Sequence, residues 1–93
     1  VVCVCLEGRL HEKTLANIEA VVARGATVVG IGAEGDKELS RLCDWMIPLP
    51  RTHPIIMSVL AGLPLQLLSY YCADFLGTDI DQPRNLAKSV TVE

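Results

Sequence analysis

The chain has 93 residues, enough for one small domain or for part of a larger one. Eight lysines and arginines against eleven aspartates and glutamates give a formal net charge of −3, so a basic face for nucleic acid is not expected. With 51% hydrophobic and 20% charged residues, the chain is not disordered, and we expect some apolar surface to meet another chain or further sequence.

The first predicted element is a strand over residues 1–6, because a continuous apolar run is typical of a strand buried on both faces. Since the chain opens inside this strand, on Val1, we expect it to be cut from a longer protein. Apolar residues at spacings of three and four then predict an amphipathic helix over about residues 10–24, which Gly25 ends. The spaced residues are Leu15, Ile18 and Val22.

The following elements continue the alternation of strand and helix. Residues 27–31 predict a second buried strand, and Asp36 can cap a short helix that ends near Leu42. Residues 45–47 predict a third strand, which the segment 48–50 would end because its prolines cannot continue a ladder. This order indicates an α/β fold in which helices cover both faces of a parallel sheet.

A long apolar helix completes the pattern, with Pro54 in its first turn and Gly77 at its end. Pro64 must kink this helix or divide it near Gly62. Its uncharged stretch, residues 55–73, approaches the length of a membrane span, but no lysine or arginine flanks it. We interpret it as a helix buried on most sides, with a stripe of small and polar residues that suits packing against another helix, including one from a second subunit. The stripe consists of Ser58, Gly62, Gln66, Ser69 and Ala73.

The four cysteines are Cys3, Cys5, Cys43 and Cys72. Cys3 and Cys5 are two apart in a strand, so they share one face and cannot easily pair with each other. No C-x-x-C pair is present, so a zinc site is not expected. We interpret the four residues as free thiols in a reducing compartment.

Residues 30–35 read Gly-Ile-Gly-Ala-Glu-Gly, which matches the G-x-G-x-x-G pattern of dinucleotide-binding loops. Glu34 and Asp36 would place two negative charges where phosphates bind, and no convincing ribose-binding acid follows about 20 residues on. The run also follows the second predicted strand rather than an evident first one. We therefore interpret it as a glycine-rich turn.

Four titratable residues allow a catalytic interpretation, but simpler ones are favoured. His11 has no acidic partner at ligand spacing and is interpreted as a solvated helix start, and His53 as part of a loop before a helix. Asp79 and Asp81 could pair as carboxylates, but a turn cap or a salt bridge with Arg84 is the favoured interpretation.

Lys88 lies among small and apolar residues near the end of the chain. A lysine enclosed by such residues would be partly desolvated, which lowers its pKa and frees the amine to attack a carbonyl. Composition alone favours an ordinary solvated tail lysine.

Two segments late in the chain bear on the role of Lys88. Residues 79–93 read Asp-Ile-Asp-Gln-Pro-Arg-Asn-Leu-Ala-Lys-Ser-Val-Thr-Val-Glu, and residues 63–71 read Leu-Pro-Leu-Gln-Leu-Leu-Ser-Tyr-Tyr. They resemble the glutamine–fructose-6-phosphate aminotransferase family, also called glucosamine-6-phosphate synthases. The resemblance implies the later half of a sugar isomerase (SIS) domain over residues 1–77, which is a flavodoxin-like αβα sandwich with a parallel sheet, here with three strands and three helices. It also implies a C-terminal tail over residues 78–93 that covers the sugar site.

The resemblance implies roles for four tail residues. In the family, ammonia from glutamine passes through a channel to two SIS domains, where fructose 6-phosphate becomes glucosamine 6-phosphate. A tail lysine forms a Schiff base with the sugar carbonyl, and its match is Lys88. Leu86, Ala87 and Val90 are implied to line the sugar site and the channel exit, where a cover would exclude water. The family also implies a sugar-phosphate ligand, a homodimer formed through SIS-domain helices, a cytoplasmic location and no cofactor.

Other parts of the family's machinery have no match in this sequence. The chain begins with Val1 rather than the cysteine nucleophile of the glutaminase domain, and the phosphate loops, glutamate base and ring-opening histidine lie upstream. We transfer none of those roles to His11, Glu12 or His53, and we expect this fragment alone to be inactive. Two alternatives stay open, namely a non-catalytic SIS-type module for sugar-phosphate binding or dimerisation and a nucleotide-binding α/β domain.

Overall fold

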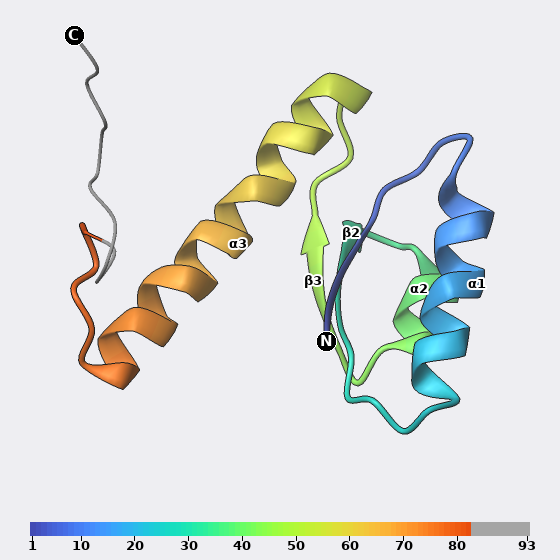
Figure 1. The fold of residues 1–93 in the computed structure, drawn as a ribbon. Helices are drawn as coiled ribbons and strands as arrows, with labels where there is room; N and C mark the ends of the chain where they lie inside the picture. Colours follow the sequence, from blue (N-terminus) through green and yellow to red (C-terminus); the bar gives the residue numbers. More distant parts are fainter. Residues whose placement is uncertain (83–93) are drawn as a thin grey trace, which may run out of the picture. The chain divides into compact units, whose positions relative to one another are not determined.

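A computed structural model describes residues 1–82. Three strands and three helices alternate along the chain, which confirms the predicted α/β order (Figure 1). They are β1 (Val2–Cys5), α1 (His11–Val22), β2 (Val29–Ala33), α2 (Lys37–Leu42), β3 (Trp45–Leu49) and α3 (Pro54–Leu76). The residues form two compact units that meet within α3, one over Val1–Gly62 and one from Leu63 on. Each unit is described by itself.

The first unit contains a parallel sheet in the order β1-β2-β3. Val2 pairs with Val29, and Val29 pairs with Trp45, so the three strands begin level with one another. Because all three strands run the same way, the loops that follow them meet at one edge of the sheet. This carboxyl edge is where open α/β sheets usually bind ligands.

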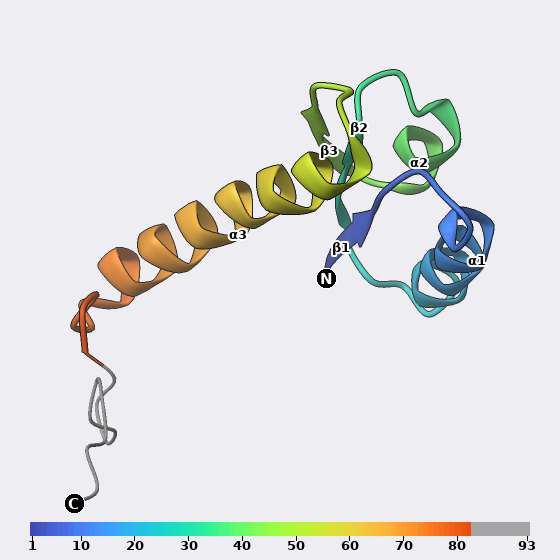
Figure 2. The same ribbon diagram turned by 90° about the horizontal axis from the view of Figure 1, so that it is seen from above.

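Two small cores hold the sheet to its helices. Helices α1 and α2 lie on one face of the sheet (Figure 2). They contribute Leu15, Ile18 and Leu39, which pack with Cys5 of β1 and with Val28. The second core joins the first turns of α3 to the sheet. It consists of Ile31, Ala33, Leu49, Met57 and Ala61. Helices therefore cover both faces of the sheet, as the alternating pattern predicted.

The third strand extends further than the sequence predicted. It continues through Pro48 to Leu49, and Pro48 stands in register with Gly32. Within the described residues β3 has β2 as its one neighbour, and an edge strand directs alternate N–H groups away from the sheet. A proline at such a position removes no ladder hydrogen bond, so the prediction that proline ends the strand was wrong.

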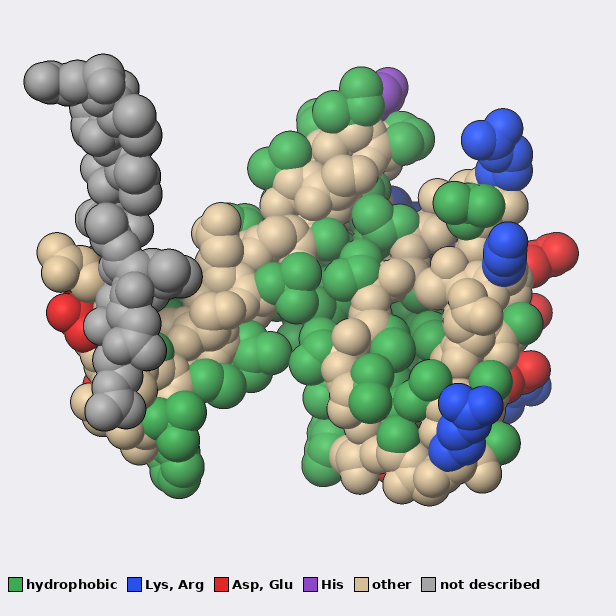
Figure 3. Space-filling model, in the orientation of Figure 1, with side chains coloured by type: hydrophobic (Ala, Val, Ile, Leu, Met, Phe, Trp, Pro, Cys, Tyr) green, Lys and Arg blue, Asp and Glu red, His purple; other side chains and the backbone are tan. Residues whose placement is uncertain are grey.

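Helix α3 bears on two predictions. The helix is continuous through Pro64, so of the two predicted outcomes, a kink or a division near Gly62, the division does not occur. Within residues 1–82 its buried residues are Met57 and Ala61 alone, so the prediction of burial on most sides was wrong for the part of the chain described. Apolar side chains gather along the helix (Figure 3). Among them, Phe75 is 90% exposed. By length and composition α3 would suffice to cross a membrane, a test that core helices of soluble proteins also pass.

The end of α3 matches its predicted stop. Gly77 has a φ of +68°, and the Thr78 N–H donates to the carbonyl of Ala73 at 3.0 Å, which closes the last turn. The Asp79 carboxylate then accepts hydrogen bonds from the backbone N–H groups of Asp81 and Gln82, at 2.9 and 3.2 Å. These bonds confirm Asp79 as a turn cap.

Candidate functional site

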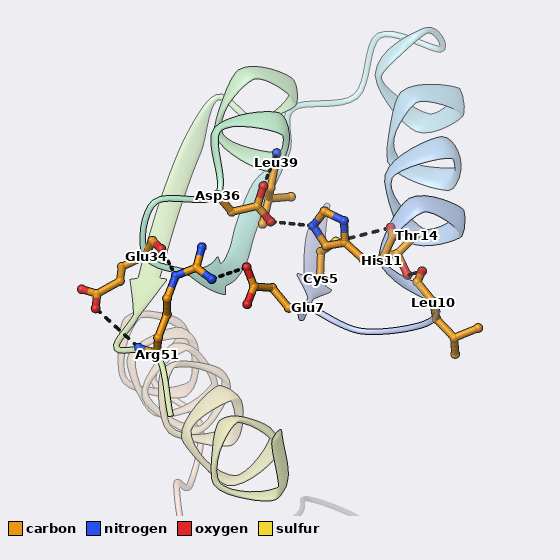
Figure 4. A network of polar contacts seen from close by, with 9 residues as sticks. All are labelled: Cys5, Glu7, Leu10, His11, Thr14, Glu34, Asp36, Leu39 and Arg51. Atoms are coloured by element: carbon orange, nitrogen blue, oxygen red, sulfur yellow. Dashed lines mark hydrogen bonds and ion pairs between the residues drawn. The ribbon is translucent and has the colours of Figure 1, made fainter. Parts of the chain in front are cut away.

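The carboxyl edge of the sheet carries an open polar pocket of about 610 Å³. The loop after β1, the turn after β2 and the segment after β3 supply its walls, with the first turns of α1 and α2. Its charged side chains are Glu7, Arg9, His11, Glu12, Asp36, Lys37, Glu38 and Arg51. Figure 4 shows that several of them are joined by hydrogen bonds and ion pairs.

A hydrogen bond between His11 and Asp36 lies in one wall of this pocket. The two atoms His11 Nε2 and Asp36 Oδ2 are 2.7 Å apart, and the side chains are only 17% and 5% exposed. Asp36 also caps α2, because its Oδ1 accepts the N–H of Leu39 at 3.0 Å. One carboxylate thus fastens the start of α1 to the start of α2, and the prediction that His11 is a solvated helix start was wrong.

The pKa of Asp36 reflects this double contact. Burial of Asp36 by itself raises the pKa of its carboxyl group, but the hydrogen bonds from Leu39 and His11 and the charge of His11 outweigh it and lower the pKa below its ordinary value. A carboxyl group with a lowered folded-state pKa stabilises the fold above its unfolded pKa of 3.8, and this stabilisation is lost as the pH falls through the folded-state value.

We expect Asp36→Asn to lower the free energy of unfolding at pH 7 by about 2 kcal/mol, the scale of a hydrogen bond to a charged group, because asparagine can still cap α2 but its amide carries no negative charge. Urea unfolding measured at pH 7 and at pH 3 tests this. The loss should shrink at pH 3, which lies below the unfolded pKa of 3.8, because the unfolded wild-type chain takes up a proton there and the stabilisation by the carboxylate charge declines. An equal loss at both pH values would contradict the assigned role of the charge.

Arg51 joins the three loops of the carboxyl edge. Its Nη1 forms an ion pair with Glu7 after β1, and its Nε donates to the backbone carbonyl of Glu34 at 2.9 Å. The Arg51 and Glu7 side chains are each about half exposed, so solvent screens the pair and its contribution to stability is small. Sequence analysis missed this contact, because Glu7 and Arg51 are separated by 44 positions.

Packing accounts for the G-x-G-x-x-G motif. A Cβ atom at Gly30 would lie 2.5 Å from the Cys43 sulfur, and one at Gly32 would lie 2.7 Å from the Cys5 carbonyl oxygen. Gly35 has a φ of +79°, which other residues rarely adopt. Each glycine thus has a structural reason to be there, which supports the interpretation of the motif as a glycine-rich turn.

Burial keeps two of the cysteines protonated at neutral pH. All four cysteines are free thiols, as predicted. Burial raises the pKa of Cys5 to about 11 and also raises the pKa of Cys43. Within residues 1–82, no three histidine, cysteine or acidic side chains converge to hold a metal ion.

Comparison with known proteins identifies relatives of this chain. No family model matches the chain. It is 57% identical over 84 residues to the glutamine–fructose-6-phosphate aminotransferase [isomerizing] of Symbiobacterium thermophilum, which covers 90% of this chain and 14% of that protein. It is 53% identical over all 93 residues to an enzyme of the same name from Thermus thermophilus, covering 15% of that protein. The one from Sphingobium yanoikuyae is 48% identical over 94 residues, which is 60% of its length.

The chain belongs to the glutamine–fructose-6-phosphate aminotransferase family. It spans 14–15% of the length of the first two of these relatives. The three-stranded parallel sheet with three helices is consistent with a partial SIS-type domain of this aminotransferase family.

The residues that the structure describes therefore do not include the predicted site of the aminotransferase family. Lys88, Leu86, Ala87 and Val90 lie outside residues 1–82, so their predicted roles stay predictions. The structure places His53 just before α3, where its Nδ1 accepts the N–H of Ile55 at 3.3 Å, which agrees with the predicted loop position. The His11–Asp36 pair and the Arg51 contacts are the polar features that sequence analysis missed. Of these features, the capping role of Asp36 was the one part that could be predicted from neighbouring residues.

Proposed function

We propose that this chain is part of the isomerase moiety of a glutamine–fructose-6-phosphate aminotransferase. Such an enzyme converts fructose 6-phosphate and glutamine into glucosamine 6-phosphate and glutamate in the cytoplasm. The observation that carries the proposal is 53% identity over the whole chain to a relative of that name. The sequence of residues 79–93, which resembles the tail of the family, supports it independently of the fold.

In this proposal Lys88 is the catalytic residue. Its neutral amine attacks the open-chain sugar carbonyl and forms a carbinolamine, which loses water to give a protonated Schiff base. The positive charge on that nitrogen makes the neighbouring C–H bond more acidic, which is what an isomerisation between ketose and aldose requires. Leu86, Ala87 and Val90 would line the same site and exclude water from the imine. No cofactor is needed for these steps.

The direct test uses the full-length protein that contains this chain. Incubation with fructose 6-phosphate and glutamine should yield glucosamine 6-phosphate, identified by mass spectrometry, whereas this chain alone should yield none. Supplying ammonium salts in place of glutamine tests the isomerase moiety separately. Binding of fructose 6-phosphate with no product from either nitrogen source would overturn the proposal in favour of a non-catalytic SIS-type binding module.

We also propose that the exposed side of α3 forms a subunit interface in a homodimer. A helix that is apolar all round is normally buried, but large apolar residues of α3 are exposed in this structure. These include Leu63, Leu67, Tyr71, Phe75 and Leu76. Charge repulsion is weak in a chain with a net charge of −3 and does not oppose association.

We expect the 93-residue chain by itself to self-associate because of this surface. Sedimentation velocity should show dimers or larger species at micromolar concentration, and Phe75→Glu should shift the distribution toward monomer. Lys13→Glu, which changes an exposed position on α1, is the matched control and should leave the distribution unchanged. A wild-type chain that stays monomeric at this concentration would contradict the expectation.

A further inference from the structure

Three cysteines share one face of the sheet, and two of them are neighbours. Cys3 of β1 stands in register with Gly30 of β2. Paired residues of adjacent strands point to the same face, and the strands lie about 4.8 Å apart. Because Gly30 has no side chain, the sulfur of Cys43 occupies the space above it, 2.5 Å from where a Cβ atom would stand. The Cys43 sulfur therefore covers the position beside Cys3 on the neighbouring strand.

The next row of the sheet separates Cys5 from this pair. Cys5 is in register with Gly32, and the space above Gly32 is filled by the side chain of Leu39 instead of a cysteine. Cys5 is also only 1% exposed, whereas Cys3 and Cys43 are each partly exposed. Cys3 and Cys43 are thus open to an oxidant, and both pack against the same buried cluster of the sheet and its helices.

We propose that Cys3 and Cys43 form a reversible intramolecular disulfide when the protein meets a peroxide. One thiolate attacks hydrogen peroxide, which is reduced to water, and becomes a sulfenic acid. The thiolate of the other cysteine attacks that sulfur. The S–S bond forms as the S–O bond breaks, and the oxygen leaves as a second water that takes up the proton released by the attacking thiol. The bond would fasten β1 to the residue that ends α2, and a thiol reductant would reverse it.

The surroundings of Cys43 determine how this reaction depends on pH. Burial raises the pKa of Cys43, and the charges of Cys3, Asp44 and Asp36 raise it further. Thiolate is therefore scarce at neutral pH and becomes more abundant as the pH rises. We expect the rate of cross-linking to increase steadily from pH 7 to pH 9, so the pair would respond to strong or sustained oxidation.

Peptide mapping tests the proposal directly. The reduced protein, carrying Cys72→Ser to prevent cross-links between molecules, is treated with hydrogen peroxide, alkylated and digested with trypsin. Cleavage after Arg9, Arg41 and Arg51 should leave peptides 1–9 and 42–51 joined, with fragment ions that place the bond on Cys3. The melting temperature of the oxidised protein should rise by several degrees and return after dithiothreitol.

Two single variants separate the neighbouring cysteines. Cys3→Ser should abolish the cross-link, and Cys5→Ala should retain it. If Cys5→Ala does not fold, the fragment ions of the parent protein still decide which cysteine is bonded. Linkage through Cys5, or peptides 1–9 and 42–51 that stay separate while the thiols are oxidised further, would overturn the proposal.

Discussion

Replacing Lys88 with alanine in the full-length protein should abolish formation of glucosamine 6-phosphate. The expected loss in kcat is roughly three orders of magnitude or more, the scale seen when an enzyme loses a covalent nucleophile. The physical reason is that, in the proposed mechanism, the isomerisation passes through an imine on Lys88. Product formation from fructose 6-phosphate and ammonium salts, followed by mass spectrometry, measures this without requiring glutamine hydrolysis.

Two further variants make the result specific. Lys88→Arg keeps the positive charge, but its guanidinium group stays protonated and cannot attack a carbonyl, so it should be as inactive as the alanine variant. Lys13→Ala removes an exposed lysine on α1 and should leave kcat unchanged. Retained activity in Lys88→Arg would show that the position supplies charge rather than a nucleophile, which contradicts the Schiff-base role.

Replacing Gly32 with valine should largely unfold the first compact unit. Even a Cβ atom at this position would lie 2.7 Å from the Cys5 carbonyl oxygen and still closer to the fully buried side chain of Leu39. The clash with the backbone of β1 cannot be relieved by rotating a side chain, so β1 and β2 would have to move apart. We expect a loss of about 3 kcal/mol or more, at the upper end for overpacked cores and a large part of the stability of a small domain.

Gly62→Ala provides the matched control for this prediction. Gly62 lies within α3, and no atom would come within 4 Å of an added Cβ. Alanine has the higher helix propensity, so this variant should be unchanged or more stable by up to about 1 kcal/mol. Urea unfolding followed by circular dichroism compares the two variants. A Gly32→Val protein as stable as wild type would contradict the packing role assigned to the glycine motif.

Local patterns were enough to predict the order of the elements. The apolar run at residues 1–6, the capping position of Asp36 and the stop at Gly77 all depend on neighbours in sequence, and each is present in the structure. Predictions that depend on distant residues were less successful. The third strand was expected to end at Pro48. The local sequence does not reveal that β3 has a single neighbour in the described sheet.

The polar contacts at the carboxyl edge show the same limit. His11 and Asp36 are separated by 25 positions, and the parallel sheet brings them within 2.7 Å. Their contact with each other is not one that a local pattern could reveal. The role of Lys88 has another origin, because it depends on resemblance to an enzyme family. Composition by itself favours an ordinary solvated lysine at that position.

The most direct test of the Schiff-base proposal is chemical trapping in the full-length protein. Sodium borohydride added in the presence of fructose 6-phosphate reduces an imine to a stable secondary amine, so the sugar phosphate becomes permanently attached to the lysine that formed it. Peptide mapping should find the adduct on Lys88, with none when fructose 6-phosphate is left out. An unmodified Lys88 in protein that is producing glucosamine 6-phosphate would contradict the proposed mechanism.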